Sequence, residues 1–219
     1  MSRVTVQETK MLAWATHTAL THGARLVAEG DYIPYDQGVR HIATIAGYLC
    51  YGMMALTVCF GILTTTGWAR RQITRPALTS THMVLAVSTL TFGVLHAVSY
   101  VFQTGEHFTP VNAVIPFVAG GEFEVGLGIV GLELAVAIAL SIVVQRRLGY
   151  RRWHLLHYLA YAAFALSLAH TITTSAEVQA LGLVGIAVFG LAAACVLLWV
   201  LRILPATTAV GLRFATKEA

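Results

Sequence analysis

The chain has 219 residues, of which 57% are hydrophobic and only 11% are charged, whereas about a quarter of the residues in an ordinary soluble domain are charged. This composition excludes a soluble globular protein and indicates a membrane protein. The formal net charge of +4 at pH 7 does not indicate nucleic-acid binding, because the basic residues of a multi-span protein primarily indicate how it is oriented in the membrane.

Residues 1–39 form an N-terminal segment of balanced charge. Its longest apolar run, MLAWA, is too short for the apolar region of a signal peptide, so we expect no cleaved signal. Residues 9–28 are expected to form an amphipathic helix at the membrane surface. A sixth span in this segment is disfavoured by Arg25, His17 and His22. We expect the N-terminus to lie outside the cytoplasm.

Charge-poor runs follow that are each long enough to cross a hydrocarbon core of about 30 Å as a helix. They are too long and too uniformly apolar for the strands of a barrel. We therefore predict an all-α membrane protein, a bundle of five transmembrane helices, or six if the N-terminal segment also crosses. The expected spans are residues 41–69, 77–103, 125–144, 153–174 and 179–201. They form one transmembrane domain, residues 40–203, followed by a cytoplasmic tail, residues 204–219.

The basic residues gather on one side of this topology. Ten of the 14 Lys and Arg lie in three places: Arg70, Arg71 and Arg75; Arg146, Arg147, Arg151 and Arg152; and Arg202, Arg213 and Lys217. The opposite connections, residues 104–124 and 176–179, hold four Glu and no Lys or Arg. By the positive-inside rule, the arginine-rich loops and the C-terminus are cytoplasmic, in a multi-pass protein of the cell membrane.

Two short motifs carry little functional information. Cys50, Cys59 and Cys195 are isolated, without C-x-x-C or C-x-x-C-H, so we expect free core cysteines and neither covalent haem attachment nor iron–sulfur ligation. Gly126, Gly128 and Gly131 form a G-x-G-x-x-G that lies inside a span and follows no strand. We interpret these glycines as close-packing sites between helices.

Four histidines carry the strongest signal. His82 and His96 are 14 residues apart, so they lie about 40° apart around a helix and about 21 Å apart along it. His157 and His170 lie 13 apart on another span that runs in the same direction. Topology therefore places His82 level with His157 and His96 level with His170. A pair of facing imidazoles is an axial site for haem iron.

A histidine that hydrogen-bonds a neighbouring helix is the alternative for any one of them, but two level pairs need a common explanation. The small residues Ala86, Thr89 and Gly93 lie on the histidine face of their helix and would give a flat macrocycle clearance.

The spacing of 13 is anomalous. On an ideal helix it turns His170 about 140° away from His157, so this span must overwind, carry a bulge, or present its ligands from different faces. Thr171 would be the position in phase. His154 is an alternative to His157 but is no better phased with His170.

These residues resemble a known family. A His-x13-His helix, followed two spans later by an arginine-rich loop and by WHLLHYLAY with a second histidine 13 residues on, is similar to the ferric reductase transmembrane domain. That group includes the membrane parts of NADPH oxidases and ferric reductases and the haem subunit of the bacterial periplasmic methionine sulfoxide reductase system. The resemblance covers roughly residues 40–202. It implies two stacked b haems, the inner on His82 and His157 and the outer on His96 and His170, which carry electrons outward.

Several charged residues are candidates for supporting roles in such a domain. Candidates for the inner haem propionates or a flavin phosphate are Arg146, Arg147, Arg151 and Arg152, with lipid contact and orientation as their alternative role. Arg40 and His41 are candidates for the outer propionates. Glu133, a carboxylate within a span, is either a packing residue or a proton or quinone site. Glu106, His107, Glu122 and Glu124 are either a weak site for ferric iron or a solvated loop.

No flavin or nicotinamide domain is recognisable in the chain, so we expect electrons from a separate cytoplasmic donor. This donor is either a flavoprotein carrying FAD or FMN or a membrane quinol, and the acceptor is ferric iron, oxygen or a partner protein. One rival is a quinol-linked cytochrome b subunit, in which both histidine pairs would be expected 14 apart. A second rival is a carrier without haem whose histidines relay protons.

Overall fold

The structure is a computed structural model that describes residues 34–66, 69, 72–104, 108–118 and 122–203. The expected surface helix at residues 9–28, the sixth span and the tail at 204–219 lie outside these residues. Arg70, Arg71, Glu106 and His107 also lie outside them.

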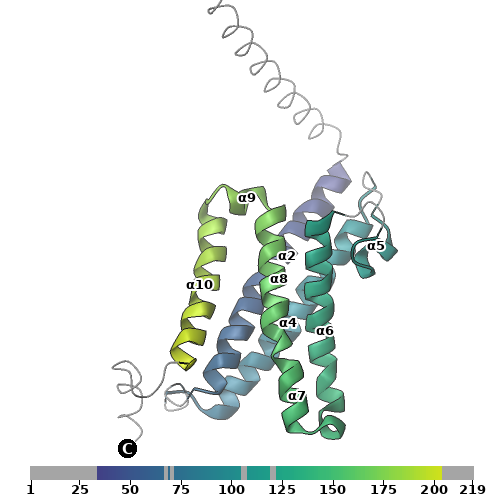
Figure 1. Cartoon of the computed structure of the whole chain (residues 1–219). Helices are drawn as coiled ribbons and strands as arrows, with labels where there is room; N and C mark the ends of the chain where they lie inside the picture. The colour runs from purple at the N-terminus through teal and green to yellow at the C-terminus, as the bar shows by residue number, and fades with distance from the viewer. Residues whose placement is uncertain (1–33, 67–68, 70–71, 105–107, 119–121, 204–219) are drawn as a thin grey trace, which may run out of the picture.

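The described residues form α-helices and no strands (Figure 1). Within the described ranges, five stretches are long and apolar enough to cross a membrane: Tyr35–Thr64, Arg75–Val101, Phe123–Leu148, Tyr150–Thr174 and Leu183–Ile203. The prediction of an all-α membrane protein with five spans is confirmed.

The first span is α2, Pro34–Thr64, and its bounds differ from the expected 41–69. It begins earlier because proline suits the first turn of a helix and Asp36 lies in that turn, where a carboxylate is favourable. It ends earlier because the hydroxyls of Thr64, Thr65 and Thr66 donate to the carbonyls of Gly61 and Ile62. These bonds satisfy acceptors that the end of a helix leaves free.

The second span is α4, Arg75–Val101. Thr74 caps its start by accepting a hydrogen bond from the backbone N–H of Ala77. At its other end, Asp36 of α2 accepts hydrogen bonds from the backbone N–H and the hydroxyl of Thr104. The far end of α4 is therefore tied to the start of α2.

A short helix, α5, Pro110–Val114, lies in the loop that follows. Its exposed apolar side chains include Val111 and Val114. Phe117 follows it, stacks on Phe123 with ring centroids 5.7 Å apart, and packs on Gly126. The loop therefore covers one side of the next span at this end of the bundle.

The third and fourth spans form a hairpin. They consist of α6, Phe123–Leu148, then α7, Tyr150–His157, and α8, Leu159–Thr174. The turn between α6 and α7 is Gly149, with φ of 75°, a conformation that glycine adopts without steric cost. The last elements are α9, Ala176–Gln179, and α10, Leu183–Ile203.

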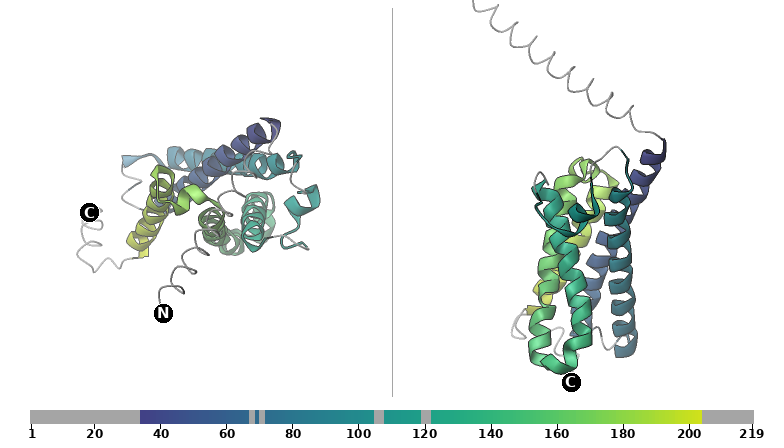
Figure 2. Two further views of the ribbon diagram at one scale, coloured as in Figure 1. Left: turned by 90° about the horizontal axis from the view of Figure 1, so that it is seen from above. Right: turned by 90° about the vertical axis from the view of Figure 1, so that its right-hand side faces the viewer.

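The helices pack as two pairs with α10 beside them. α2 packs along α4, α6 packs along α8, and α10 packs on α2, an arrangement seen end-on in Figure 2. The apolar core lies where α2, α8 and α10 meet and includes Tyr51, Ile62, Phe164 and Val188. The predicted free core cysteines are confirmed for Cys59 and Cys195, whose sulfurs lie 3.3 Å apart in this core.

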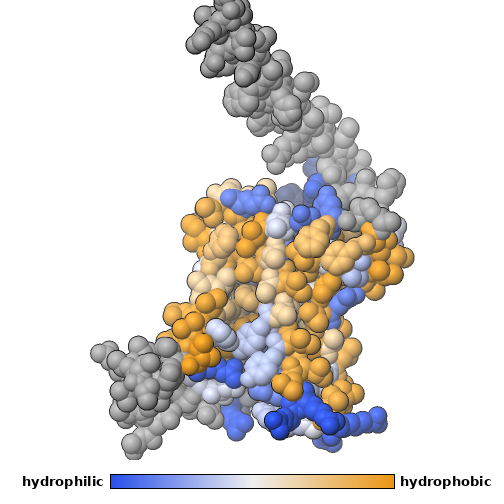
Figure 3. All heavy atoms as spheres, in the orientation of Figure 1, coloured by the Kyte–Doolittle hydropathy of each residue, from blue (hydrophilic) through white to orange (hydrophobic). Residues whose placement is uncertain are grey.

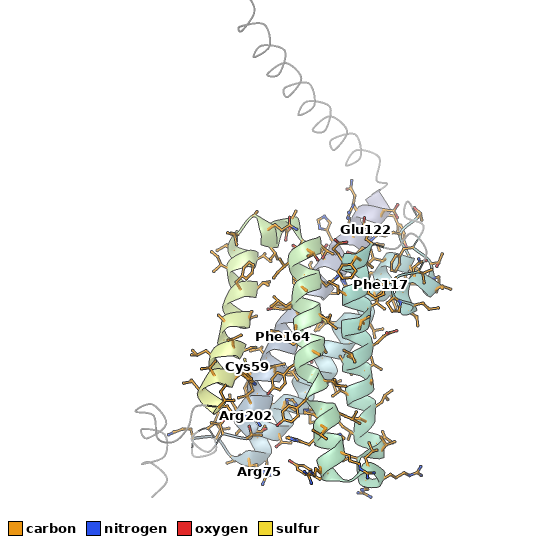
Figure 4. The ribbon with its side chains drawn as sticks, viewed as in Figure 1. Cys59, Arg75, Phe117, Glu122, Phe164 and Arg202 are labelled. Carbon is orange, nitrogen blue, oxygen red and sulfur yellow. The ribbon has the colours of Figure 1, made fainter. Side chains whose placement is uncertain are left out.

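The two ends of the bundle differ in charge. Figure 4 shows Arg75 and Arg202 at one end and Phe117 and Glu122 at the other. The visible face is mostly hydrophobic at mid-height, with hydrophilic residues gathered below α6 and α7 (Figure 3). We call the two ends the arginine end, which carries Arg75, Arg146, Arg147, Arg151, Arg152 and Arg202, and the α5 end.

Candidate site: two facing histidine pairs

The four histidines of the sequence pattern face one another in two pairs. The ring centroids of His82 on α4 and His157 on α7 lie 6.1 Å apart, with ring planes at 65°. Those of His96 on α4 and His170 on α8 lie 6.2 Å apart, with ring planes at 75°. The first pair lies toward the arginine end and the second toward the α5 end.

These separations suit a metal ion between the rings. Two metal–imidazole bonds of about 2 Å each, together with the ring radii, would place the centroids about 6 Å apart. His154, the alternative to His157, instead stacks on Tyr150 at 5.5 Å and contacts Tyr158 edge-on at 4.8 Å.

The irregularity expected in the fourth span lies at Tyr158, where α7 ends and α8 begins. The Tyr158 N–H is shared between the carbonyls of His154 and Leu155, and the Tyr161 N–H bonds to Tyr158, three residues back. Bonds over three residues tighten a helix beyond the α-helical turn. The span therefore overwinds between its two histidines, and both imidazoles face α4 despite a spacing of 13.

Three of the four imidazoles are held by hydrogen bonds to a backbone carbonyl. The Nδ1 of His82 lies 2.9 Å from the carbonyl oxygen of Thr57, that of His96 lies 2.7 Å from Ala43, and that of His170 lies 2.8 Å from Glu124. A carbonyl can only accept, so Nδ1 carries the proton and Nε2 keeps a lone pair. This arrangement is the usual support of a metal-bound histidine.

A glycine lies four residues after each accepting carbonyl. A Cβ at Gly47 or Gly128 would lie 2.8 Å from the Nδ1 of His96 or His170, and one at Gly61 would lie 3.2 Å from the Cε1 of His82. A side chain in a helix covers the turn before it, so a larger residue would obstruct the carbonyl four residues earlier. We call Ala43 with Gly47, Thr57 with Gly61, and Glu124 with Gly128 the glycine–carbonyl pairs.

His157 is the exception, because its Nδ1 is buried and has no hydrogen-bond partner in the part of the chain that the structure describes. Its ring stacks on Trp153 with centroids 5.0 Å apart and planes at 28°. The indole Nε1 of Trp153 donates to the hydroxyl of Ser141 on α6 at 3.1 Å. Trp153 is therefore held between α6 and His157, whereas its neighbour Tyr150 is 69% exposed.

The donor set favours a cofactor over a bare ion. Among the described residues, no three or more His, Cys, Asp or Glu side chains gather in a group that could hold a metal. Two imidazoles are too few for a structural zinc site, which has four protein ligands. They suit haem iron, because a porphyrin supplies the remaining donors and leaves only the axial positions.

The charged candidates lie at the surface. Arg40 and His41 near the α5 end are exposed, and so are Arg146, Arg147, Arg151 and Arg152 at the arginine end. Glu122 is exposed and Glu124 is half-buried. Glu133 is exposed on α6 rather than packed between helices.

Gln103 is a residue that the sequence pattern did not single out. It follows α4 at the α5 end and is 4% exposed, and neither its amide nitrogen nor its amide oxygen has a hydrogen-bond partner among the described residues. Buried amides are normally paired, so this side chain points to a polar group not supplied by the described chain. The available signal was its position seven residues after His96, which equals about two helical turns, although α4 itself ends at Val101.

Small residues between the histidines bring the helices close. Gly93 is contacted by Leu132 of α6 and by the sulfur of Cys50. Thr89 is buried, with its hydroxyl 3.4 Å from that of Thr57. Part of the stripe expected to clear a macrocycle is thus filled by neighbouring side chains. The packing role between helices predicted for the α6 glycines is confirmed for Gly131, which lies against Ser167 and the Ala163 carbonyl of α8, whereas Gly126 lies against Phe117 of the preceding loop.

The comparison with known families now adds to this geometry. Residues 46–168 match the family model described as ferric reductase like transmembrane component. The match begins within α2, ends within α8 and includes His82, His96 and His157. His170 lies two residues beyond it. Comparisons with curated proteins and with solved structures give no match.

Proposed function

Since this chain belongs to the ferric reductase-like transmembrane component family, we propose that it carries electrons between the two membrane faces through two b haems. It is a multi-pass membrane protein, and its family supports a role in transmembrane electron transfer. Haem iron with two axial imidazoles takes up and releases one electron at a time. The observation that carries the proposal is the pair of facing imidazoles at each of two depths, with centroids 6.1 and 6.2 Å apart.

The axial ligands in this proposal are His82 and His157 at the arginine end and His96 and His170 at the α5 end. Carbonyl acceptors on Nδ1 support the assignment for His82, His96 and His170, because they leave Nε2 free to bind iron. Burial in the bundle excludes water, and the absence of C-x-x-C-H in the sequence favours non-covalent b haem.

The direction proposed is from the cytoplasm outward. The arginine end is cytoplasmic by the positive-inside rule, with the N-terminal end of α2 on the opposite side. Arg146, Arg147, Arg151 and Arg152 are exposed around the α6–α7 turn. Such a cluster suits an acidic surface or a flavin phosphate of a cytoplasmic flavoprotein donor. The acceptor at the α5 end is ferric iron or a partner protein.

Gln103 is our candidate contact for a propionate of the outer haem. Its amide is buried and has no partner among the described residues, and it lies two residues after the end of the helix that carries His96, on the side to which an outer propionate would extend. An amide N–H donates readily to a carboxylate. Arg40 and His41 are exposed, so they suit solvent better than a buried propionate.

Spectroscopy of the purified protein tests the proposal. We expect a Soret band, reduced-minus-oxidised bands typical of b haem, and two haems per chain. His96→Ala and His157→Ala should each remove about one haem. His154→Ala is the matched control, because that ring faces Tyr150 and Tyr158 rather than His82, and it should retain both.

The same measurements separate the rivals. A colourless wild-type protein made in haem-replete cells would contradict the proposal and favour the proton-relay carrier. Reduction by a quinol analogue, blocked by a quinone-site inhibitor and independent of any flavoprotein, would favour a quinol-linked cytochrome b subunit.

A further inference from the structure

The register of α6 explains why His157 lacks the support that the other three imidazoles have. Glu124 and Gly128 of α6 serve His170. Because α6 runs antiparallel to α7 and α8, the positions that would serve His157 lie 13 or 14 residues further along α6. Residues 137–142 read AIALSI and contain no glycine. Ser141 lies there instead.

Ser141 already hydrogen-bonds to the carbonyl that an imidazole could otherwise use. Its hydroxyl donates to the carbonyl of Ile138 at 2.6 Å, and its oxygen accepts from the indole Nε1 of Trp153 at 3.1 Å. The side chain is buried in the α6–α7 hairpin. The only polar group of the indole is thereby satisfied, which fixes the ring in one orientation against α6.

The fixed indole in turn restrains the imidazole. The Trp153 and His157 rings are nearly parallel, at 28°, with centroids 5.0 Å apart. They lie four residues apart on α7, where side chains of a helix meet. Rotation of His157 about its ring bond would break this stack and bring its face against the indole edge. Stacking on Trp153 therefore orients the His157 ring, whereas a hydrogen bond to a carbonyl orients each of the other three imidazoles.

From these contacts we infer that Trp153, held by Ser141, is the positioning residue for His157 and makes the two haem sites chemically unequal. The inference rests on the proposed function. In the outer site, both imidazoles donate Nδ1–H to a carbonyl, which makes them more basic ligands. In the inner site, only His82 does so. Trp153 and Ser141 therefore act on one site and leave the other unchanged.

The test is electron paramagnetic resonance and redox titration of the purified haem protein. The largest g value of a bis-imidazole ferric haem depends on the angle between the two ring planes. The inner signal is identified as the one missing from His157→Ala. In Trp153→Leu, we expect that signal and its midpoint potential to shift while the outer signal and potential stay at their wild-type values. Ser141→Ala should shift the same signal by less, and Ser141→Thr, which keeps a hydroxyl, should restore it.

Trp199→Leu is the matched control, since Trp199 lies on α10, is 44% exposed, and should leave both signals unchanged. The inference is overturned if both signals in Trp153→Leu are unchanged, or if both shift together. If Trp153→Leu does not fold, Ser141→Ala decides by the same criteria. A wild-type protein without haem would overturn the proposed function as well, whereas two intact haem signals that ignore Trp153 would overturn this inference alone.

Discussion

At the scale of single residues, a helix carbonyl can serve a neighbouring helix only where nothing covers it. The carbonyls of Ala43, Thr57 and Glu124 accept from imidazoles on α4 and α8, and each precedes a glycine by four residues. A carbonyl oxygen has two lone pairs, so it can keep its helical hydrogen bond and accept a second one. Glycine is therefore needed at these positions because a larger side chain would obstruct the histidine, and not because the backbone conformation requires it.

Adding a methyl group at these glycines should displace the imidazoles in proportion to the overlap. Gly47→Ala and Gly128→Ala place Cβ 2.8 Å from Nδ1. Each should cost about 1–3 kcal/mol of stability and most of the outer haem. Gly61→Ala, at 3.2 Å, should weaken the inner haem only partly. Haem content and the two spectral components measure the effect.

Gly52→Ala is the control for this series. It lies on α2, and a Cβ there meets nothing within 4 Å. It should keep both haems and gain up to about 1 kcal/mol from the higher helix propensity of alanine. Equal haem loss in Gly52→Ala and Gly47→Ala would contradict the role of the glycine–carbonyl pairs.

The substitution Gln103→Leu distinguishes a side chain that contacts haem from one that has no ligand. If its amide contacts an outer propionate, Gln103→Leu should weaken retention of the outer haem and shift only the outer potential. If the amide has no ligand, leucine relieves an unsatisfied buried group and should raise stability by about 1–3 kcal/mol, with unchanged spectra. Gln179→Leu is the control, because the Gln179 amide donates to the carbonyls of Ile172 and Thr173. It should leave the spectra of both haems unchanged.

At the scale of elements, the break at Tyr158 reconciles a spacing of 13 with two ligands on one side of a span. α7 and α8 are separate helices joined by three-residue hydrogen bonds at Tyr158 and Tyr161. The sequence predicted that some irregularity was needed but not where it lies. WHLLHYLAY contains no proline or glycine that would mark the position.

Deleting Leu159 tests this junction, because it shortens the histidine spacing to 12, which is about 120° out of phase on an ideal helix. The deletion should turn α7 by about 100° relative to α8 and shift it by about 1.5 Å, which takes His157 away from His82. We expect loss of about one haem per chain with the outer signal kept, measured by haem quantitation and magnetic resonance. An alanine inserted after Gly149, in the turn, should be tolerated. Retention of both haems after deletion of Leu159 would show that the junction does not set the ligand direction.

At the scale of the whole molecule, α4 packs on α2 and α8 packs on α6, so each histidine helix is supported from behind. α2 also joins both helix pairs toward the α5 end, because its Asp36 binds Thr104 after α4, and its Tyr48 hydroxyl binds Ser175 and Glu177 after α8. Arg202 of α10 donates to the hydroxyl of Tyr161 toward the arginine end. The histidine pairs thus lie between two supported helix pairs rather than within one.

The proposed orientation can be measured on intact cells. A cysteine at Ala180, exposed in the turn after α9, should react with a membrane-impermeant maleimide added outside. A cysteine at Arg151, exposed at the arginine end, should react only after lysis. The native cysteines lie within the spans and give the background, which is measured in the parent chain. The reverse labelling pattern would invert the direction of electron flow proposed above.

The sequence by itself determined the number of spans, their type, the charge asymmetry and the two histidine spacings, because these depend on local composition and on the fixed geometry of a helix. The tertiary structure decided which carbonyls hold the imidazoles, why Gly47, Gly61 and Gly128 lie where they do, and that Trp153 stacks on His157. It also moved the start of α2 to Pro34. The carbonyl partners lie up to 53 positions from their histidines, and no local pattern in the chain records which helix face meets which.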